Sequence, residues 1–151
     1  MKEIALTKGK TAFVDDEDYE RVSQYKWSAS VAGGGCFRAR CYILGVHVYL
    51  SHFIVGKPEI GVVDHRDRNA LNNTRANLRF CTYSENGANA KIRKSKTGYK
   101  GVWTHRQKWR AAIRQNGKYF YLGSFETPKQ AALAYDAAAR ERFGEFALTN
   151  F

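Results

Sequence analysis

The chain has 151 residues, enough for one domain or two small ones, and carries a net charge of +11. No apolar run approaches the length of a membrane span, and the start of the chain has no secretory apolar segment, so we expect a cytoplasmic protein. Three cysteines without a C-x-x-C spacing argue against a zinc ribbon or a disulfide framework. We interpret Cys36, Cys41 and Cys81 as buried, reduced thiols; a Cys36–Cys41 disulfide is the alternative.

The positive charge is concentrated in the last part of the chain. Residues 1–60 carry 8 Lys or Arg against 7 Asp or Glu, and residues 61–89 carry 4 against 3. Residues 90–151 carry 13 against 4, which gives a net charge of +9. A basic segment with interleaved aromatic residues is typical of nucleic-acid binding.

The first 56 residues predict a small β-rich segment. Residues 1–14 alternate weakly between apolar and polar side chains, which indicates two short strands. Asp15 or Asp16 can cap a short acidic helix that extends to Gln24. Glycines 33–35 lack the rest of a phosphate-loop motif and therefore predict a turn between strands. The strands expected around this turn are residues 27–32, 36–44 and 46–50.

The middle of the chain, residues 61–86, predicts strand, loop, strand and helix. Residues 61–65 are apolar and β-prone, residues 66–73 contain many turn-forming side chains, and residues 77–81 form the second expected strand. Thr82 or Ser84 can cap a short helix that carries Asn86. Packing of this helix on the two strands would bring Asp64 and Asn86 together.

The segment from Val63 to Asn86 reads VDHRDRNALNNTRANLRFCTYSEN. It resembles the ββα-metal core of phage-type HNH homing endonucleases with Asn in the third motif position. The resemblance implies that His65 is the general base, that Asp64 and Asn86 bind a metal, and that Asn77, the second catalytic-motif residue, braces the loop by hydrogen bonds. Oxygen ligands favour Mg²⁺ or Mn²⁺ over zinc. The family often has His-Arg where this chain has Ser51-His52, which leaves the role of His52 open.

Residues 90–98 are polar and basic, and we interpret them as a linker that lies along DNA. From residue 91 to residue 118 the chain has ten Lys or Arg and no acidic residue. Such a segment gains counterion release when it meets a phosphate backbone. The alternative is a solvated connector with no binding role. The linker residues expected to contact DNA are Lys91, Arg93, Lys94 and Lys96.

Residues 99–151 predict three strands and one helix. Asn116-Gly117 is a strong hairpin signal between the second and third strands. Thr127 is expected to cap a helix that starts at Pro128 and ends near Phe143. Its alanines allow the helix to lie close to the sheet.

This part of the chain resembles the AP2 DNA-binding domain. The resemblance is carried by the segments YKGV, KWRAAI, LGSFET and AALAYD and by the final Asn150-Phe151. The resemblance implies that the outer face of the three-stranded sheet enters the major groove. Base preference cannot be transferred, because plant AP2 domains often have Arg or Trp at several of these positions. The residues implied to face DNA are Lys100, Trp103, Lys108, Arg110, Arg114, Tyr119 and Tyr121.

Together these patterns predict an α+β chain. An HNH nuclease domain is expected over residues 1–89, with a β-rich part over 1–56 and the ββα-metal core over 61–89. A basic linker follows over residues 90–98, and an AP2-like domain, a three-stranded antiparallel sheet packed on one helix, occupies residues 99–151.

The implied function is a site-specific, divalent-metal-dependent endonuclease of the homing type that hydrolyses a phosphodiester in double-stranded DNA. The chain has a single Asp64, His65 and Asn86 set and no heptad seam, so we expect a monomer without an obligate protein partner that nicks one strand. The alternative is an AP2-type DNA-binding regulator with an inactive HNH core. RNA binding has less support, because the usual RNA-binding motifs are absent.

Overall fold

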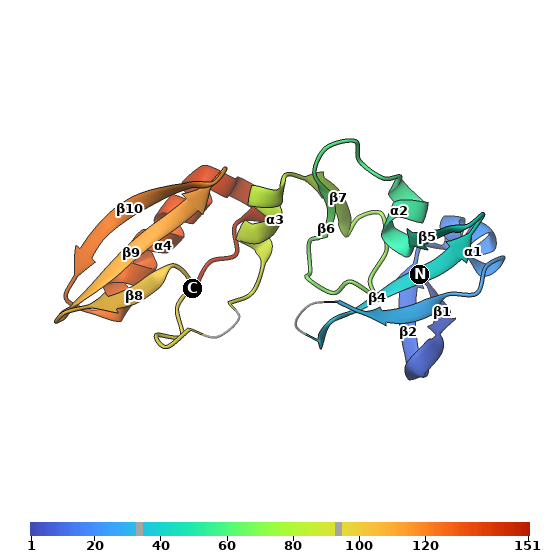
Figure 1. Cartoon of the computed structure of the whole chain (residues 1–151), viewed down its shortest axis with the longest axis horizontal. Helices are drawn as coiled ribbons and strands as arrows, with labels where there is room; N and C mark the ends of the chain where they lie inside the picture. Colours follow the sequence, from blue (N-terminus) through green and yellow to red (C-terminus); the bar gives the residue numbers. More distant parts are fainter. Residues whose placement is uncertain (33–34, 93–94) are drawn as a thin grey trace. The chain divides into compact units, whose positions relative to one another are not determined.

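The computed structural model describes residues 1–32, 35–92 and 95–151. Contacts divide the chain into two compact units, Met1–Cys81 and Thr82–Phe151, which Figure 1 shows as a mixture of small antiparallel sheets and short helices. The chain is therefore α+β, as expected. In the described residues, no helix is both long and apolar enough to cross a membrane.

The first unit contains three small antiparallel sheets. Strands β1 (Lys2–Leu6) and β2 (Lys10–Val14) form the first sheet, with the 3-10 turn η1 (Thr7–Gly9) between them. Strands β3 (Ser28–Val31), β4 (Phe37–Ile43) and β5 (Val46–Tyr49) form the second sheet, in that order. The third sheet is the pair β6 (Val62–His65) and β7 (Leu78–Cys81), and two helices, α1 (Asp16–Ser23) and α2 (Leu50–Val55), complete the unit.

One hydrophobic core joins these elements. Val14 of β2, Val22 of α1 and Leu50 of α2 have no exposed surface, and Trp27 donates its indole N–H to the Val22 carbonyl, 2.9 Å away. Tyr19 packs at the edge of this core, so Tyr19 and Val22 form the inner face of α1, as a helical spacing of three residues predicts.

Helix α2 corrects the prediction of a strand over residues 46–50. The strand ends at Tyr49, and Leu50 begins a helix whose buried residues are Leu50, Ser51 and Ile54. Leu50 and Ile54 are four residues apart, which places both on one helical face toward the core. The cysteine prediction is also corrected in part: all three cysteines are free, but Cys36 is exposed because it lies in the connection before β4.

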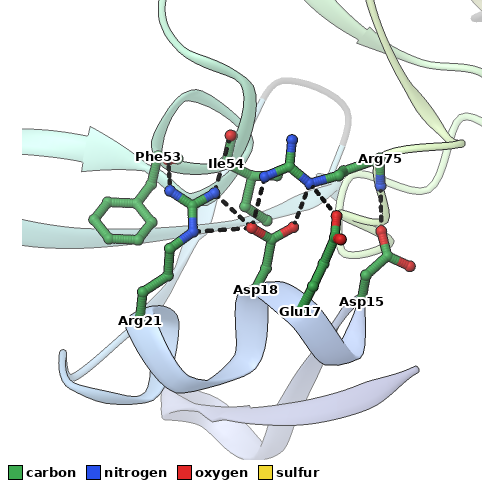
Figure 2. Close-up of polar contacts among 7 residues, drawn as sticks. All are labelled: Asp15, Glu17, Asp18, Arg21, Phe53, Ile54 and Arg75. Carbon is green, nitrogen blue, oxygen red and sulfur yellow. Dashed lines mark hydrogen bonds and ion pairs between the residues drawn. The ribbon is translucent and has the colours of Figure 1, made fainter.

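The N-terminal segment holds the loop between β6 and β7. The amide of Phe13 donates to Leu71, and the Phe13 carbonyl accepts from the amide of Asn73, each at 2.8 Å. A cluster of charged side chains adds to this attachment (Figure 2). The guanidinium of Arg75 contacts both carboxylate oxygens of Asp18 at 2.9 Å, and its backbone N–H donates to Asp15 at 2.7 Å. The loop is therefore fixed at both its middle and its end.

Asp18 is the centre of this cluster. Its side chain is only 2% exposed, and it accepts hydrogen bonds from Arg75 and from Arg21, which also donates to the carbonyls of Phe53 and Ile54. Burial tends to raise the pKa of Asp18, but the two guanidinium groups outweigh it and lower the pKa below its ordinary value of 3.8. This carboxylate therefore contributes stability that is present above pH 3.8 and is lost as the pH falls through its folded pKa.

We expect Asp18→Asn to destabilise the first unit by about 2 kcal/mol, because it leaves two cations opposite a neutral side chain; both are partly exposed, which limits the cost. Urea unfolding of the full chain at pH 7 measures the effect. Asp16→Asn is the matched control: Asp16 is exposed and forms an ion pair with the terminal ammonium, so this variant should leave the free energy of unfolding nearly unchanged. Equal effects of the two variants would contradict the role of the buried cluster.

The second unit is a three-stranded sheet with helices on it. Its strands are β8 (Val102–His105), β9 (Lys108–Gln115) and β10 (Lys118–Phe125), with β9 in the centre. Helix α4 (Pro128–Phe143) packs on this sheet, and helix α3 (Tyr83–Asn89) and the 3-10 turn η3 (Gly144–Phe146) complete the unit. The prediction for this helix is confirmed, because Thr127 caps it in a capping box and Pro128 is its first residue.

Small residues bring α4 close to the sheet. Ala131 and Ala132 have no exposed surface and pack with Val102 and Ala111. On the sheet side, a Cβ at Gly101 would lie 2.0 Å from Cδ2 of the buried Tyr135 ring, and the backbone there has φ +72°. Only glycine fits at this position.

The end of the chain is tied to α4 by a buried carboxylate. Asp136, which has no exposed surface, accepts hydrogen bonds from the backbone N–H groups of Asn150 and Phe151 at 2.8 and 2.9 Å. The side-chain oxygen of Asn150 accepts from the amide of Lys100 at 2.6 Å. These bonds explain why Asp136 and Asn150 occur together in the AP2-like pattern.

The two compact units divide between Cys81 and Thr82, inside the segment up to residue 89 that the sequence assigns to the nuclease domain. Thr82 caps α3 in a capping box, as predicted, but Ala88 of this helix belongs to the core formed by Ile113, Tyr135 and Phe143. The carbonyl of Ala88 also accepts from the amide of Leu148 at 3.1 Å. Helix α3 is therefore part of the second unit, because its apolar side is buried there.

Candidate active site

Asp64 lies in the β6–β7 hairpin, opposite Arg79. Oδ2 of Asp64 accepts hydrogen bonds from Nη2 and Nε of Arg79 at 2.9 and 3.0 Å, and both side chains are 7% exposed. The cross-strand register thus holds the carboxylate in a fixed orientation next to His65. The sequence alone did not indicate Arg79 as the partner of Asp64, because that pairing depends on the register of the two strands.

His65 follows Asp64 and is half-buried. Its Nε2 lies 3.3 Å from the side-chain oxygen of Asn73. Burial lowers the pKa of His65 below its ordinary value of 6.5, and a positive charge on Arg38 acts in the same direction; Asn73, Asp67 and Asp64 oppose the shift without reversing it. The imidazole is therefore neutral at pH 7, the protonation state that a general base requires.

Asn73 sets the tautomer of this imidazole. An amide oxygen only accepts hydrogen bonds, so Nε2 of His65 carries the hydrogen in this contact and Nδ1 is the basic nitrogen. Asn73 is itself 2% exposed, and its side-chain N–H group donates to the carbonyl of Ala70 at 3.5 Å. The sequence shows Asn73 within the Asn-rich loop, but only its burial beside His65 identifies its contact.

Asn77 braces the loop between the strands. Its side-chain oxygen accepts from the amide of Asp67 at 3.0 Å, and its side-chain nitrogen donates to Oδ1 of Asp67 at 2.9 Å and to the carbonyl of Asn72 at 2.7 Å. The bonds expected of this residue are therefore present. Burial tends to raise the pKa of Asp67. The hydrogen bonds from Asn69, Asn72 and Asn77 outweigh this effect and lower the pKa below its ordinary value. Asp67 is thus the loop's central acceptor.

Asn86 lies on α3 and is half-buried in the second unit, where its backbone N–H donates to the carbonyl of the Thr82 cap at 3.0 Å. The described residues contain no group of three or more His, Cys, Asp or Glu side chains arranged to hold a metal. The Asp64 carboxylate and the Asn86 amide belong to different units, and each offers an oxygen donor. This donor chemistry fits a hard divalent cation that keeps most of its water ligands.

The outer face of the β8–β10 sheet combines cationic and aromatic side chains. Tyr119 is 75% exposed and Tyr121 is 60% exposed, and the guanidinium carbons of Arg114 and Arg110 lie 5.4 and 5.9 Å from their respective ring centres. Trp103 is also exposed on β8. Side chains alternate along β9, since Ala111 and Ile113 are buried on the other face. These contacts keep the arginines extended over the sheet.

The remaining predicted DNA-contacting lysines have different surroundings. Lys108 is exposed and forms an ion pair with Glu126 at 2.9 Å. Lys100 donates from its ammonium to the carbonyls of Ala88 and Ala90, so it also binds the C-terminal end of α3. Lys91 and Lys96 are exposed, whereas Arg93 and Lys94 lie outside the described residues.

Comparisons with known proteins agree with the division of the chain into two parts. Residues 45–88 match the family model described as HNH endonuclease, and residues 97–145 match the AP2 domain model. An uncharacterized HNH endonuclease of Acanthamoeba polyphaga mimivirus is 35% identical over 148 residues, which is 95% of this chain and 76% of the viral protein. The chain belongs to the HNH endonuclease family. Both domain matches point to DNA as the partner of this HNH protein.

Two plant transcription factors match about a third of this HNH protein. An AP2-like ethylene-responsive transcription factor of Arabidopsis thaliana is 46% identical over 57 residues, which is 35% of this chain and 16% of the plant protein. Dehydration-responsive element-binding protein 2D of the same plant is 47% identical over 58 residues, 34% of this chain and 27% of its own length. The AP2-like part is thus shared with proteins that have a different overall organisation.

Proposed function

We propose that this HNH protein is a site-specific, divalent-metal-dependent DNA endonuclease of the homing type, which nicks one strand as a monomer. The observation that carries the proposal is the arrangement at the β6–β7 hairpin. A neutral imidazole, held by Asn73, follows directly after the buried carboxylate of Asp64. This combination of a base and a metal-binding oxygen is suited to hydrolysis of a phosphodiester.

His65 is the proposed general base. Its Nδ1, which the contact with Asn73 leaves as the basic nitrogen, takes a proton from the attacking water. The bond to Asn73 then stabilises the imidazolium through the remaining N–H group. Asn77 contributes indirectly, because its bonds to Asp67 and Asn72 fix the loop that carries Asn73.

Asp64 and Asn86 are the proposed ligands of the metal, and Mg²⁺ or Mn²⁺ is the expected ion. When bound, such a cation polarises the phosphate and stabilises the leaving oxygen. Arg79 has a positioning role in this scheme, because it holds Oδ2 of Asp64 while the two side chains remain buried.

The AP2-like sheet is the proposed reader of the DNA site. Its exposed face presents Arg110, Arg114 and two tyrosines, and β9 and β10 have no acidic residue. This positive face suits the negative potential of a duplex groove. The single Asp64, His65 and Asn86 set supports cleavage of one strand at a time, because one bound molecule then hydrolyses one phosphodiester.

A DNA-binding regulator without nuclease activity is the second candidate. The observation in its favour is the Asp64–Arg79 ion pair, which already occupies one carboxylate oxygen. In that case the second unit would bind DNA and the hairpin would have only a structural role.

Plasmid cleavage separates the two candidates. With Mg²⁺ or Mn²⁺, supercoiled plasmid carrying the natural target site should pass to open circle before linear product appears, at a rate first-order in protein. With EDTA it should remain supercoiled. Binding without cleavage under both conditions would favour the regulator. Prompt linearisation with a second-order dependence on protein would contradict the monomeric nickase.

Two substitutions at Asn86 test its role as a ligand. Asn86→Asp keeps an oxygen donor and should retain cleavage, whereas Asn86→Leu has a similar shape without a donor and should lose it. Asn86 is half-buried and its side chain is not part of the α3 capping box, so both variants should fold. Equal activity of the two variants would exclude Asn86 from the metal site.

A further inference from the structure

The sheet formed by β3, β4 and β5 has a polar outer face that none of the assigned functions uses. Along β4, Ala39 and Cys41 point into the core, so Arg38, Arg40 and Tyr42 point outward. The register extends this face over the neighbouring strands, because Arg40 pairs with Ser28 on one side and with Tyr49 on the other. The outer face consists of Ser28, Ser30, Arg38, Arg40, Tyr42, His47 and Tyr49.

This outer face is cationic. From residue 21 to residue 58 the chain has five Lys or Arg and no Asp or Glu. In the described part of the chain, neither Arg38 nor Arg40 forms an ion pair with a carboxylate. Their positive charges are therefore available to an anionic partner.

Aromatic rings support the cationic groups. The guanidinium carbon of Arg38 lies 5.8 Å from the ring centre of Tyr49, and Tyr42, which is 67% exposed, packs edge-on against His47 at 5.1 Å. The same chemistry of an arginine over a tyrosine occurs on the outer face of the β8–β10 sheet, where Arg114 lies 5.4 Å from the Tyr119 ring centre. Each unit therefore presents one sheet of this kind.

We propose that the outer face of the β3–β4–β5 sheet is a second DNA-binding surface, which binds the phosphate backbone of the duplex. The sheet binds phosphates through Arg38 and Arg40, and Tyr49 holds the Arg38 side chain over it. Arginine suits this role because its planar group donates to two phosphate oxygens at once. The proposal rests on the DNA endonuclease function proposed above, but it concerns binding alone.

The salt dependence of DNA binding tests this surface. The full-length chain is used in a His65→Ala background, so that binding to a non-specific duplex is measured without cleavage. Each neutralised phosphate contributes roughly 0.9 to the slope of log affinity against log salt. The double variant Arg38→Gln/Arg40→Gln should therefore reduce the slope by about 1.8 and weaken binding at low salt.

Two control variants make the result specific. Lys2→Gln/Lys129→Gln removes the same charge from two exposed positions outside this face, β1 and α4, and should leave the slope unchanged. Arg38→Lys/Arg40→Lys keeps the charge and should restore most of the slope. Loss of slope in the Lys2/Lys129 variant to the same extent would show an effect of net charge and would overturn the proposal.

Two further outcomes would also overturn it. An unchanged slope in the Arg38→Gln/Arg40→Gln variant would show that this face does not contact DNA, whatever the plasmid assay shows. If the Arg38→Gln/Arg40→Gln variant binds DNA as before but its oligomeric state in sedimentation changes, the face is a contact with a second copy of the chain. Failure of the proposed nuclease activity is distinguishable, because it appears only as the absence of cleavage in the plasmid assay.

Discussion

His65→Ala should reduce the rate of strand cleavage by about 10²–10⁴-fold and leave DNA binding nearly unchanged. The variant removes the proposed base but none of the arginines on either DNA-facing sheet. The imidazole is only half-buried, so the hairpin should remain folded. Single-turnover cleavage and duplex binding, measured on the same preparation, give the two quantities.

His105→Ala is the matched control, because His105 is an exposed histidine at the end of β8. This variant should cleave at nearly the wild-type rate. Wild-type cleavage should fall as the pH drops through the pKa of His65, which burial places below its ordinary value of 6.5. Cleavage by His65→Ala within a factor of a few of wild type would remove this residue from the mechanism.

Gly101→Ala should destabilise the second unit by about 3 kcal/mol or more. The added Cβ would lie 2.0 Å from Cδ2 of Tyr135 and 2.7 Å from the carbonyl oxygen of Ala112. Neither group can move easily, because the Tyr135 side chain is enclosed by the core and Ala112 is in the central strand. The positive φ of +72° adds a backbone cost.

Gly117→Ala separates the backbone cost from the steric cost. Gly117 has φ +81°, but a Cβ there meets no atom within 4 Å. This variant should lose only about 1 kcal/mol. Thermal unfolding of the full chain, followed in parallel with specific DNA binding, measures both. Similar losses in the two variants would show that the close approach of Tyr135 does not limit the packing of α4.

Local signals in the sequence predicted most of the secondary structure. Asn116-Gly117 indicated a hairpin, because both residues readily adopt the positive φ that they have there. Thr127 and Pro128 indicated the start of α4, because Thr is a favoured N-cap and Pro is favoured in the first turn. Helix α2 was missed because its apolar residues also suit a strand. Its Leu50–Ile54 spacing of four residues was the available signal.

Contacts between distant residues were harder to predict. Asp64 was identified from its motif, but its partner Arg79 depends on the strand register, and the role of Asn73 depends on burial beside His65. Arg75 and Asp18 are 57 residues apart, so no local pattern links them. The motif thus indicates which residues to propose for the site, whereas the residues that hold Asp64 and His65 in place depend on the packing of the whole unit.

The inclusion of α3 in the second unit has a consequence for protein engineering. A designer who wished to exchange the DNA-reading module for another would place the junction near residue 98, where the basic linker ends. Such a cut would separate Ala88 from Ile113 and Tyr135, and would remove the amide of Leu148 from the Ala88 carbonyl. A chimera joined between Cys81 and Thr82 keeps this core intact. Any transplanted module must therefore bring its own copy of the helix that carries Asn86.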